Sequence, residues 1–90
     1  EPYALLVKGQ GLYYKPRVFG GDVAAAQQTF ERLRQVLRRR SAPGIHPFEA
    51  EVWIWMAVRR QDAARGAALQ RRLLAQNPPR IFRQFLIDPP

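Results

Sequence analysis

Apolar residues recur at helical spacing along most of this chain. The clearest run lies between about Val23 and Arg39, and its apolar positions are Val23, Ala26, Phe30, Leu33 and Leu37. Positions three and four apart share one side of an α-helix, so the run predicts an amphipathic helix with one buried face. Asp22 stands just before it. An Asp at this place accepts hydrogen bonds from free N–H groups of the first turn, so Asp22 is the predicted N-cap.

Four other stretches have the pattern of helices. They run over about Pro2–Tyr14, Pro47–Arg60, Ala63–Gln76 and residues 79–88, with Asp62 as the predicted cap of the stretch that follows it. The segments between them are rich in helix breakers: Pro16 with Gly20-Gly21, Ser41-Ala42-Pro43-Gly44, and Asn77-Pro78-Pro79. The sequence therefore predicts an all-α fold of about five helices.

The third stretch, Pro47–Arg60, is apolar on two opposite sides. One side carries Phe48, Val52, Trp55 and Met56, and the other carries Ala50, Trp53, Ile54 and Ala57. A helix of this kind is packed between neighbours rather than laid on a surface. We therefore expect it at the centre of the fold.

The last short stretch is expected to cover the open end of a helical stack. We expect its apolar residues on one face and its polar residues outside: Ile81, Phe82, Phe85 and Leu86 against Arg80, Arg83 and Gln84. Stacked helical repeats need such a cap at their ends.

A pattern in the second helix recurs forty residues later. Asp22, Ala26, Phe30 and Leu33 are echoed by Asp62, Gly66, Gln70 and Leu73. A period in this range is typical of stacked helix–turn–helix units. We divide the single domain, residues 1–90, into a first repeat over about 2–40, a second over about 46–78 and a capping helix over about 79–88.

This pattern resembles the tetratricopeptide repeat family over about residues 2–78. Gly11 and Tyr14 look like the Gly-x2-Tyr pair of the first helix, and Ala26, Phe30 and Leu33 have the spacing of the second-helix signature. Trp55-Met56-Ala57 stands where the Leu-Gly region of the next unit belongs, and Asn77-Pro78 resembles the closing Asp-Pro. Gly66 and Gln70 depart from the signature, because an Ala and an aromatic residue are expected there.

The resemblance implies a right-handed superhelical stack of helix pairs. The first helix of each pair would line a concave groove that holds a peptide or a partner helix. The Phe19-Gly20-Gly21-Asp22 turn resembles that of bacterial members, which favours a bacterial exported or periplasmic protein, with a cytoplasmic one as the alternative. The chain lacks an initiator Met and opens like the join between two repeats, so we expect it to be the C-terminal part of a longer protein.

Charge raises the expectation of an anionic partner. Thirteen Arg and two Lys stand against seven acidic residues, which gives a net charge of +8 at pH 7. Arg38–Arg40 and Arg59-Arg60 lie at predicted helix C-termini, where cations are favourable without any ligand. No nucleic-acid motif such as an RNP segment or a GXXG loop is present. Binding of RNA or DNA phosphates by the arginine clusters therefore remains an alternative function.

The residues that most catalytic and metal sites need are scarce. There is no Cys, His46 is the single histidine, and no Ser/His/Asp arrangement is evident. The sequence therefore predicts a non-enzymatic protein without a cofactor or bound metal. No stretch approaches the ~18 consecutive apolar residues of a membrane span.

The candidate binding residues are aromatic side chains and the arginines beside them: Trp53, Trp55, Tyr13, Tyr14, Arg59 and Arg60. Trp53 and Trp55 are separated by roughly 200° around their helix, so they cannot enter one packing seam. Either both are buried against different neighbours, or one faces the groove as a recognition anchor. The sequence favours a protein–protein interaction module that acts as a scaffold, assembly factor or accessory subunit, or a piece that only stacks on further repeats.

Overall fold

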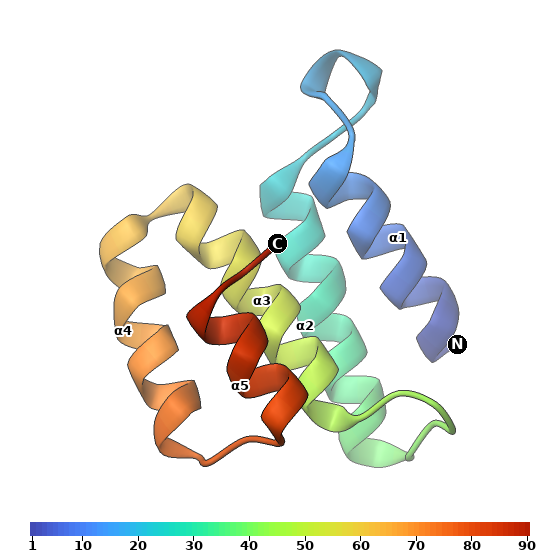
Figure 1. The fold of residues 1–90 in the computed structure, drawn as a ribbon. Helices are drawn as coiled ribbons and strands as arrows, with labels where there is room; N and C mark the ends of the chain where they lie inside the picture. The colour runs from blue at the N-terminus through green and yellow to red at the C-terminus, as the bar shows by residue number, and fades with distance from the viewer.

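The computed structural model describes all 90 residues and contains five α-helices (Figure 1). Their bounds are α1 (Pro2–Tyr14), α2 (Val23–Arg39), α3 (Pro47–Gln61), α4 (Ala63–Ala75) and α5 (Arg80–Ile87). A single 3-10 turn, η1 (Arg17–Phe19), lies in the loop between α1 and α2, which projects from one end of the molecule. Each predicted helix end is within one residue of the observed end. The all-α prediction is confirmed.

Both predicted aspartate caps are present. The Asp22 carboxylate accepts from the backbone N–H of Ala25 at 3.0 Å, and that of Asp62 accepts from Arg65 N–H at 3.2 Å. Asp62 is the only residue between α3 and α4, and its own N–H donates to the carbonyl of Val58 at 2.8 Å. One residue therefore ends α3 and begins α4, which makes the turn between them tight.

Two further caps involve residues that were not predicted to cap a helix. The Glu1 carboxylate accepts from the N–H groups of Ala4 and Tyr3 at 2.9 and 3.1 Å, and these bonds lower the pKa of Glu1. At the start of α3, the His46 Nδ1 accepts from the N–H of Phe48 at 3.0 Å. The single histidine is thus part of a helix cap.

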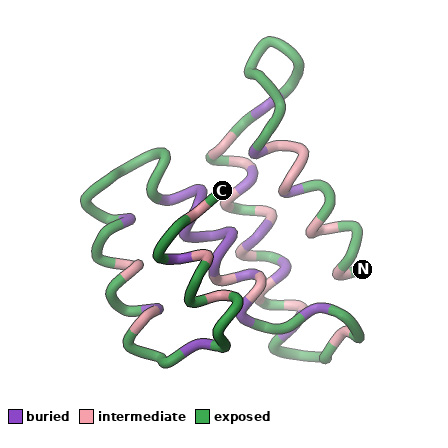
Figure 2. The backbone as a smooth tube through the Cα atoms, in the orientation of Figure 1, coloured by how far each residue is buried: buried purple, intermediate pink, exposed green.

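Helix α3 is the centre of the core. Every residue from Val52 to Val58 is buried, and Phe48 and Ala50 are buried as well. Helices α2, α4 and α5 all contact it, and Figure 2 shows the buried positions concentrated along α3. The expectation that this helix is enclosed by neighbours is confirmed.

Helix α5 packs on α3 and α4, as expected for a helix that covers them (Figure 1). Leu86 is fully buried, and Phe82 and Phe85 are half-buried. The placement of Ile81 on the packed face was wrong, because its side chain is 73% exposed. Residues 82, 85 and 86 occupy one side of the helix, and Ile81 lies about a quarter-turn away from the middle of that side.

The two departures from the repeat signature have physical roles in the packing of α4. A Cβ atom added to Gly66 would lie 2.6 Å from the Cα of Arg59, so only glycine permits this approach of α4 to α3. The freed space also lets the indole N–H of Trp55 donate to the Gly66 carbonyl at 3.0 Å. The amide of Gln70 donates to the carbonyl of Leu86 at 2.7 Å, which ties α4 to α5.

A second close approach joins α1 to α2. Gly9 is buried against the ring of Phe30, which is 0% exposed, and a Cβ added to Gly9 would overlap that ring. Gly11 lies in the same helix, but nothing stands within 4 Å of a Cβ added there. The two glycines therefore differ in what an added methyl group would meet.

We expect Gly9→Ala and Gly11→Ala to change stability in opposite directions. Gly9→Ala should lower the free energy of unfolding by about 1–3 kcal/mol, because the added methyl overpacks the contact with Phe30. Gly11→Ala is the matched control and should raise it by about 0.5–1 kcal/mol, because alanine favours the helix and meets no neighbour. Urea denaturation of the two variants measures both values. Equal changes of the same sign would contradict the close packing of α1 on α2.

Candidate functional site

The six predicted binding residues fall into two groups around α3. One group brings Tyr13 and Tyr14 of α1 together with Trp53 and Arg60 of α3. The second group pairs Trp55 with Arg59, whose guanidinium carbon lies 5.0 Å from the centre of the indole. The wide angle between the two tryptophans explains the division, because it turns them toward different neighbouring helices.

The first group belongs to a larger aromatic cluster, formed by Tyr13, Tyr14, Phe30, Trp53 and Phe85. Trp53 stands at its centre: its ring is edge-on to Tyr13 at 6.0 Å, to Tyr14 at 5.9 Å and to Phe85 at 5.6 Å. Phe30 stacks on it at 5.6 Å. Such pairs each add about 0.5–1.5 kcal/mol beyond their buried area, so the cluster ties α1, α2 and α5 to α3.

Arg60 attaches to the same cluster from the end of α3. Its guanidinium carbon lies 4.9 Å from the centre of the Tyr13 ring, and Nη1 donates to the Tyr13 carbonyl at 3.0 Å. The side chain therefore satisfies one free carbonyl at the C-terminus of α1 and places a positive charge there. Because Arg60 is exposed, this charge lies at the surface near the C-terminus of α1.

Tyr14 is the surface member of the aromatic cluster, and it continues into an apolar stripe along α1. Tyr3, Val7 and Tyr14 are 45%, 68% and 59% exposed, and their spacing places them on one side of the helix. Over eleven residues this α1 stripe extends roughly 16 Å. Val7 was missed in the sequence, although its position four residues after Tyr3 was the signal that could have found it.

The second group borders a shallow cleft between α3, α4 and α5. Its volume is about 320 Å³, and residues from all three helices line it, among them Trp55, Arg59, Gly66, Gln70 and Leu86. Trp55 is only 3% exposed, and Arg59 covers the face of its ring. The cleft therefore offers the guanidinium and the glutamine amide at its surface rather than the indole.

Both tryptophans are buried, Trp53 to 6% exposure and Trp55 to 3%. Of the two arrangements that the sequence left open, the structure has the one in which each packs against different neighbours. Trp53 also donates its indole N–H to the Glu49 carboxylate at 2.9 Å, which fixes its orientation. Phe85 was missed as a member of this site because only the fold brings it to Trp53. Glu49 was missed as well, although its position four residues before Trp53 on the same helix was the signal that could have found it. The buried Trp53 ring therefore holds the exposed Tyr14 ring in place through their edge-on contact at 5.9 Å.

The remaining chemistry of the chain is sparse. No group of three or more His, Cys, Asp or Glu side chains is placed to hold a metal ion. None of the helices combines the length and apolar character required to cross a membrane. Comparisons of the chain with protein-family models, with curated proteins and with solved structures gave no match. The site is therefore interpreted from its own geometry.

We expect substitutions in the aromatic cluster to distinguish residues that stabilise the fold from residues at its surface. Trp53→Ala should lower the free energy of unfolding by about 3–5 kcal/mol, because it removes the ring on which three helices pack. Tyr14→Ala should cost about 1 kcal/mol, since most of that ring is in solvent. Trp53→Phe is the control: it keeps a ring and loses the hydrogen bond to Glu49, so about 1 kcal/mol is expected. Urea denaturation gives the three values, and equal losses for Trp53→Ala and Tyr14→Ala would contradict this assignment.

Proposed function

We propose that this chain is a non-catalytic α-helical repeat module of tetratricopeptide type that binds another protein, as a scaffold, assembly factor or accessory subunit. One observation supports the proposal above all. The exposed large apolar side chains are confined to α1, α5 and the loop after α1: Tyr3, Val7, Tyr14, Val18, Phe19, Ile81 and Ile87. Exposed apolar side chains that lie together on one face are typical of protein-binding surfaces, and Tyr3, Val7 and Tyr14 share one side of α1.

The occupant that suits this surface best is an amphipathic helix of the partner. The α1 stripe is straight and roughly three helical turns long, so apolar residues at helical spacing on the partner can follow it. Tyr14 and the half-buried Phe85 both contact Trp53 edge-on, at 5.9 and 5.6 Å, which links α1 and α5 through α3. In a right-handed stack, which is part of this proposal, α1 would line the concave groove, whereas α3 is enclosed by its neighbours.

Charge at this surface favours an acidic partner segment. Exposed Arg60 contacts Tyr13, the residue before Tyr14, at one end of the α1 stripe. Charges at the rim of an interface mainly direct the encounter and the orientation of the partner, and they contribute less to its affinity. We therefore expect acidic residues on the partner helix near the end that meets Arg60.

Affinity would come chiefly from Tyr14. A tyrosine at an interface buries a large ring at little cost in side-chain entropy, and a few such residues dominate binding. The Tyr14 ring is already held edge-on by Tyr13 at 4.9 Å and by Trp53 at 5.9 Å. Because this ring is positioned before the partner arrives, less ordering is required on binding.

Affinity capture from the native source, with nuclease treatment and a salt wash, tests this function. We expect one defined protein to remain bound to the wild-type chain. The double variant Val7→Ser/Tyr14→Ala should retain it at least about tenfold less well, because it removes two of the three apolar side chains of the α1 stripe. The matched control is Val18→Ser/Phe19→Ser, which removes two exposed apolar side chains from the projecting loop and should leave retention unchanged.

Two results would contradict the proposal. If nuclease removes the bound material, the retained partner is a nucleic acid or depends on one. If the α1 variant and the loop variant retain the partner equally well, the α1 stripe is not the binding surface. Thermal denaturation of both variants checks that each remains folded.

A further inference from the structure

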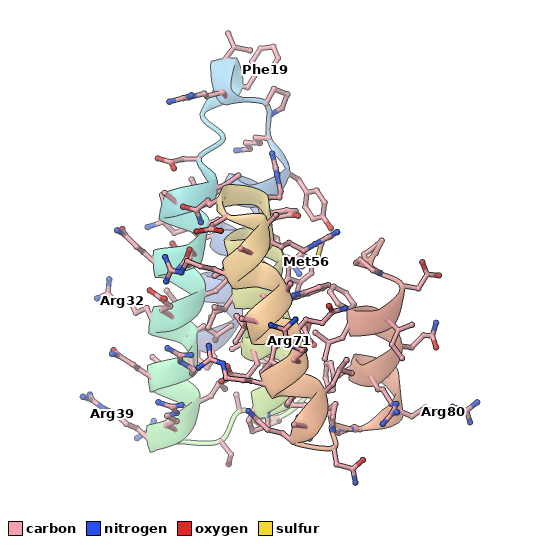
Figure 3. The ribbon with its side chains drawn as sticks, turned by 90° about the vertical axis from the view of Figure 1, so that its left-hand side faces the viewer. Phe19, Arg32, Arg39, Met56, Arg71 and Arg80 are labelled. Carbon is pink, nitrogen blue, oxygen red and sulfur yellow. The ribbon has the colours of Figure 1, made fainter.

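The outer surfaces of α2 and α4 have a chemistry opposite to that of α1 and α5. Of the thirteen arginines, seven belong to these two helices: Arg32, Arg34, Arg38 and Arg39 in α2, and Arg65, Arg71 and Arg72 in α4. Glu31 is the only acidic residue within either helix. Figure 3 shows Arg32 and Arg39 extending from α2, and Arg71 on the neighbouring α4. The two helices therefore present a strongly positive surface.

A cleft between α2 and α4 gathers part of this charge. It has a volume of about 260 Å³, and its lining includes Arg34 and Arg38 of α2, Arg72 of α4, and Glu51 of α3. Arg34 Nη1 lies 3.4 Å from Glu51 Oε1, the only carboxylate among the lining residues. Three guanidinium groups against one carboxylate leave two positive charges in the cleft.

One donor of Arg34, which lines the cleft, has no partner. The Nε atom of Arg34 is buried and makes no hydrogen bond, although the guanidinium reaches Glu51 through Nη1. A buried donor without an acceptor costs about 1–3 kcal/mol, more when the group is charged. An anion in the cleft would neutralise the two positive charges that Glu51 leaves unpaired.

We propose that the cleft between α2 and α4 binds phosphate groups in the backbone of a nucleic-acid duplex. Guanidinium groups present planar pairs of N–H donors that match phosphate oxygens. Arg38 and Arg72 supply such donors from the two sides of the cleft, and Arg34 supplies them from within. Exposed Arg32, Arg39 and Arg71 extend the positive surface beyond the cleft, so that further phosphates of the same duplex are contacted.

The distribution of apolar side chains favours nucleic acid over an acidic protein on this surface. All the exposed large apolar residues lie in α1, in α5 or in the loop after α1, and none lies in α2, α3 or α4. The core of a protein–protein interface needs aromatic or other apolar side chains and is depleted of charge. Binding to phosphates requires neither, because it is driven by the release of counterions.

The same surface favours a duplex over a single strand. Proteins that bind single strands stack bases on aromatic side chains. Phe30 is the only aromatic residue in α2 and α4, and it is 0% exposed. The arginines therefore contact the phosphate backbone only, and the binding is independent of sequence.

Fluorescence anisotropy with a labelled duplex of about 20 base pairs tests the proposal at several salt concentrations. Arg38→Gln/Arg72→Gln removes two exposed arginines of the cleft. We expect it to weaken binding at low salt by about tenfold or more, and to reduce the slope of log K against log salt by about 2. The matched control is Arg80→Gln/Arg83→Gln in α5, which removes the same charge from exposed positions outside the cleft and should leave the slope unchanged.

Three results would overturn the proposal: no binding to the duplex, equal losses in the two double variants, or tighter binding to the corresponding single strand. Poly-glutamate at an equal concentration of charge serves as competitor. Failure of this peptide to displace the duplex supports phosphate recognition, and full displacement shows a surface that responds to charge alone. This cleft is separate from the α1 stripe, so Val7→Ser/Tyr14→Ala should bind the duplex as the wild type does.

Discussion

The burial of α3 on all sides is the constraint on which the other helices depend. Seven consecutive residues, Val52 to Val58, are buried, so no face of this part of the helix tolerates water. Such a helix is stable only when neighbours cover every side, and α2, α4 and α5 do so. Both tryptophans lie within this segment, and each makes specific contacts with the helices that cover it. Trp53 receives rings from α1, α2 and α5, and Trp55 hydrogen-bonds to α4.

The enclosure of α3 also separates the surface chemistry of the molecule. Because α3 contributes little surface between its ends, the outer helices determine what the chain presents to a partner. Helices α1 and α5 carry exposed aromatic and aliphatic side chains, whereas α2 and α4 carry more than half of the arginines. A partner helix and a phosphate backbone require these two chemistries respectively, so the two proposed surfaces do not compete for the same residues.

Helix positions and caps could be predicted from the sequence because they depend on local signals. Apolar spacing marked the stripe of α2, and Asp22 and Asp62 marked two helix starts through their ability to accept backbone N–H groups. The candidate site was predicted less completely. Phe85 joins Trp53 only in the folded chain, and Ile81 lies at the edge of its helical face, where periodicity cannot distinguish exposed from packed. Likewise, Gly66 and Gln70 look like defects in a repeat signature, whereas their roles depend on how closely α4 approaches α3 and α5.

The position of Trp53 has an optical consequence. Its indole lies within 6.0 Å of the centres of four other aromatic rings, which come from three other helices. Fixed aromatic rings in an asymmetric environment give the near-ultraviolet circular dichroism of a folded protein, and this signal disappears when packing is lost while helices persist. The far-ultraviolet signal of this chain reports its helices. The near-ultraviolet signal therefore reports separately whether α1, α2 and α5 are docked on α3, without any added label.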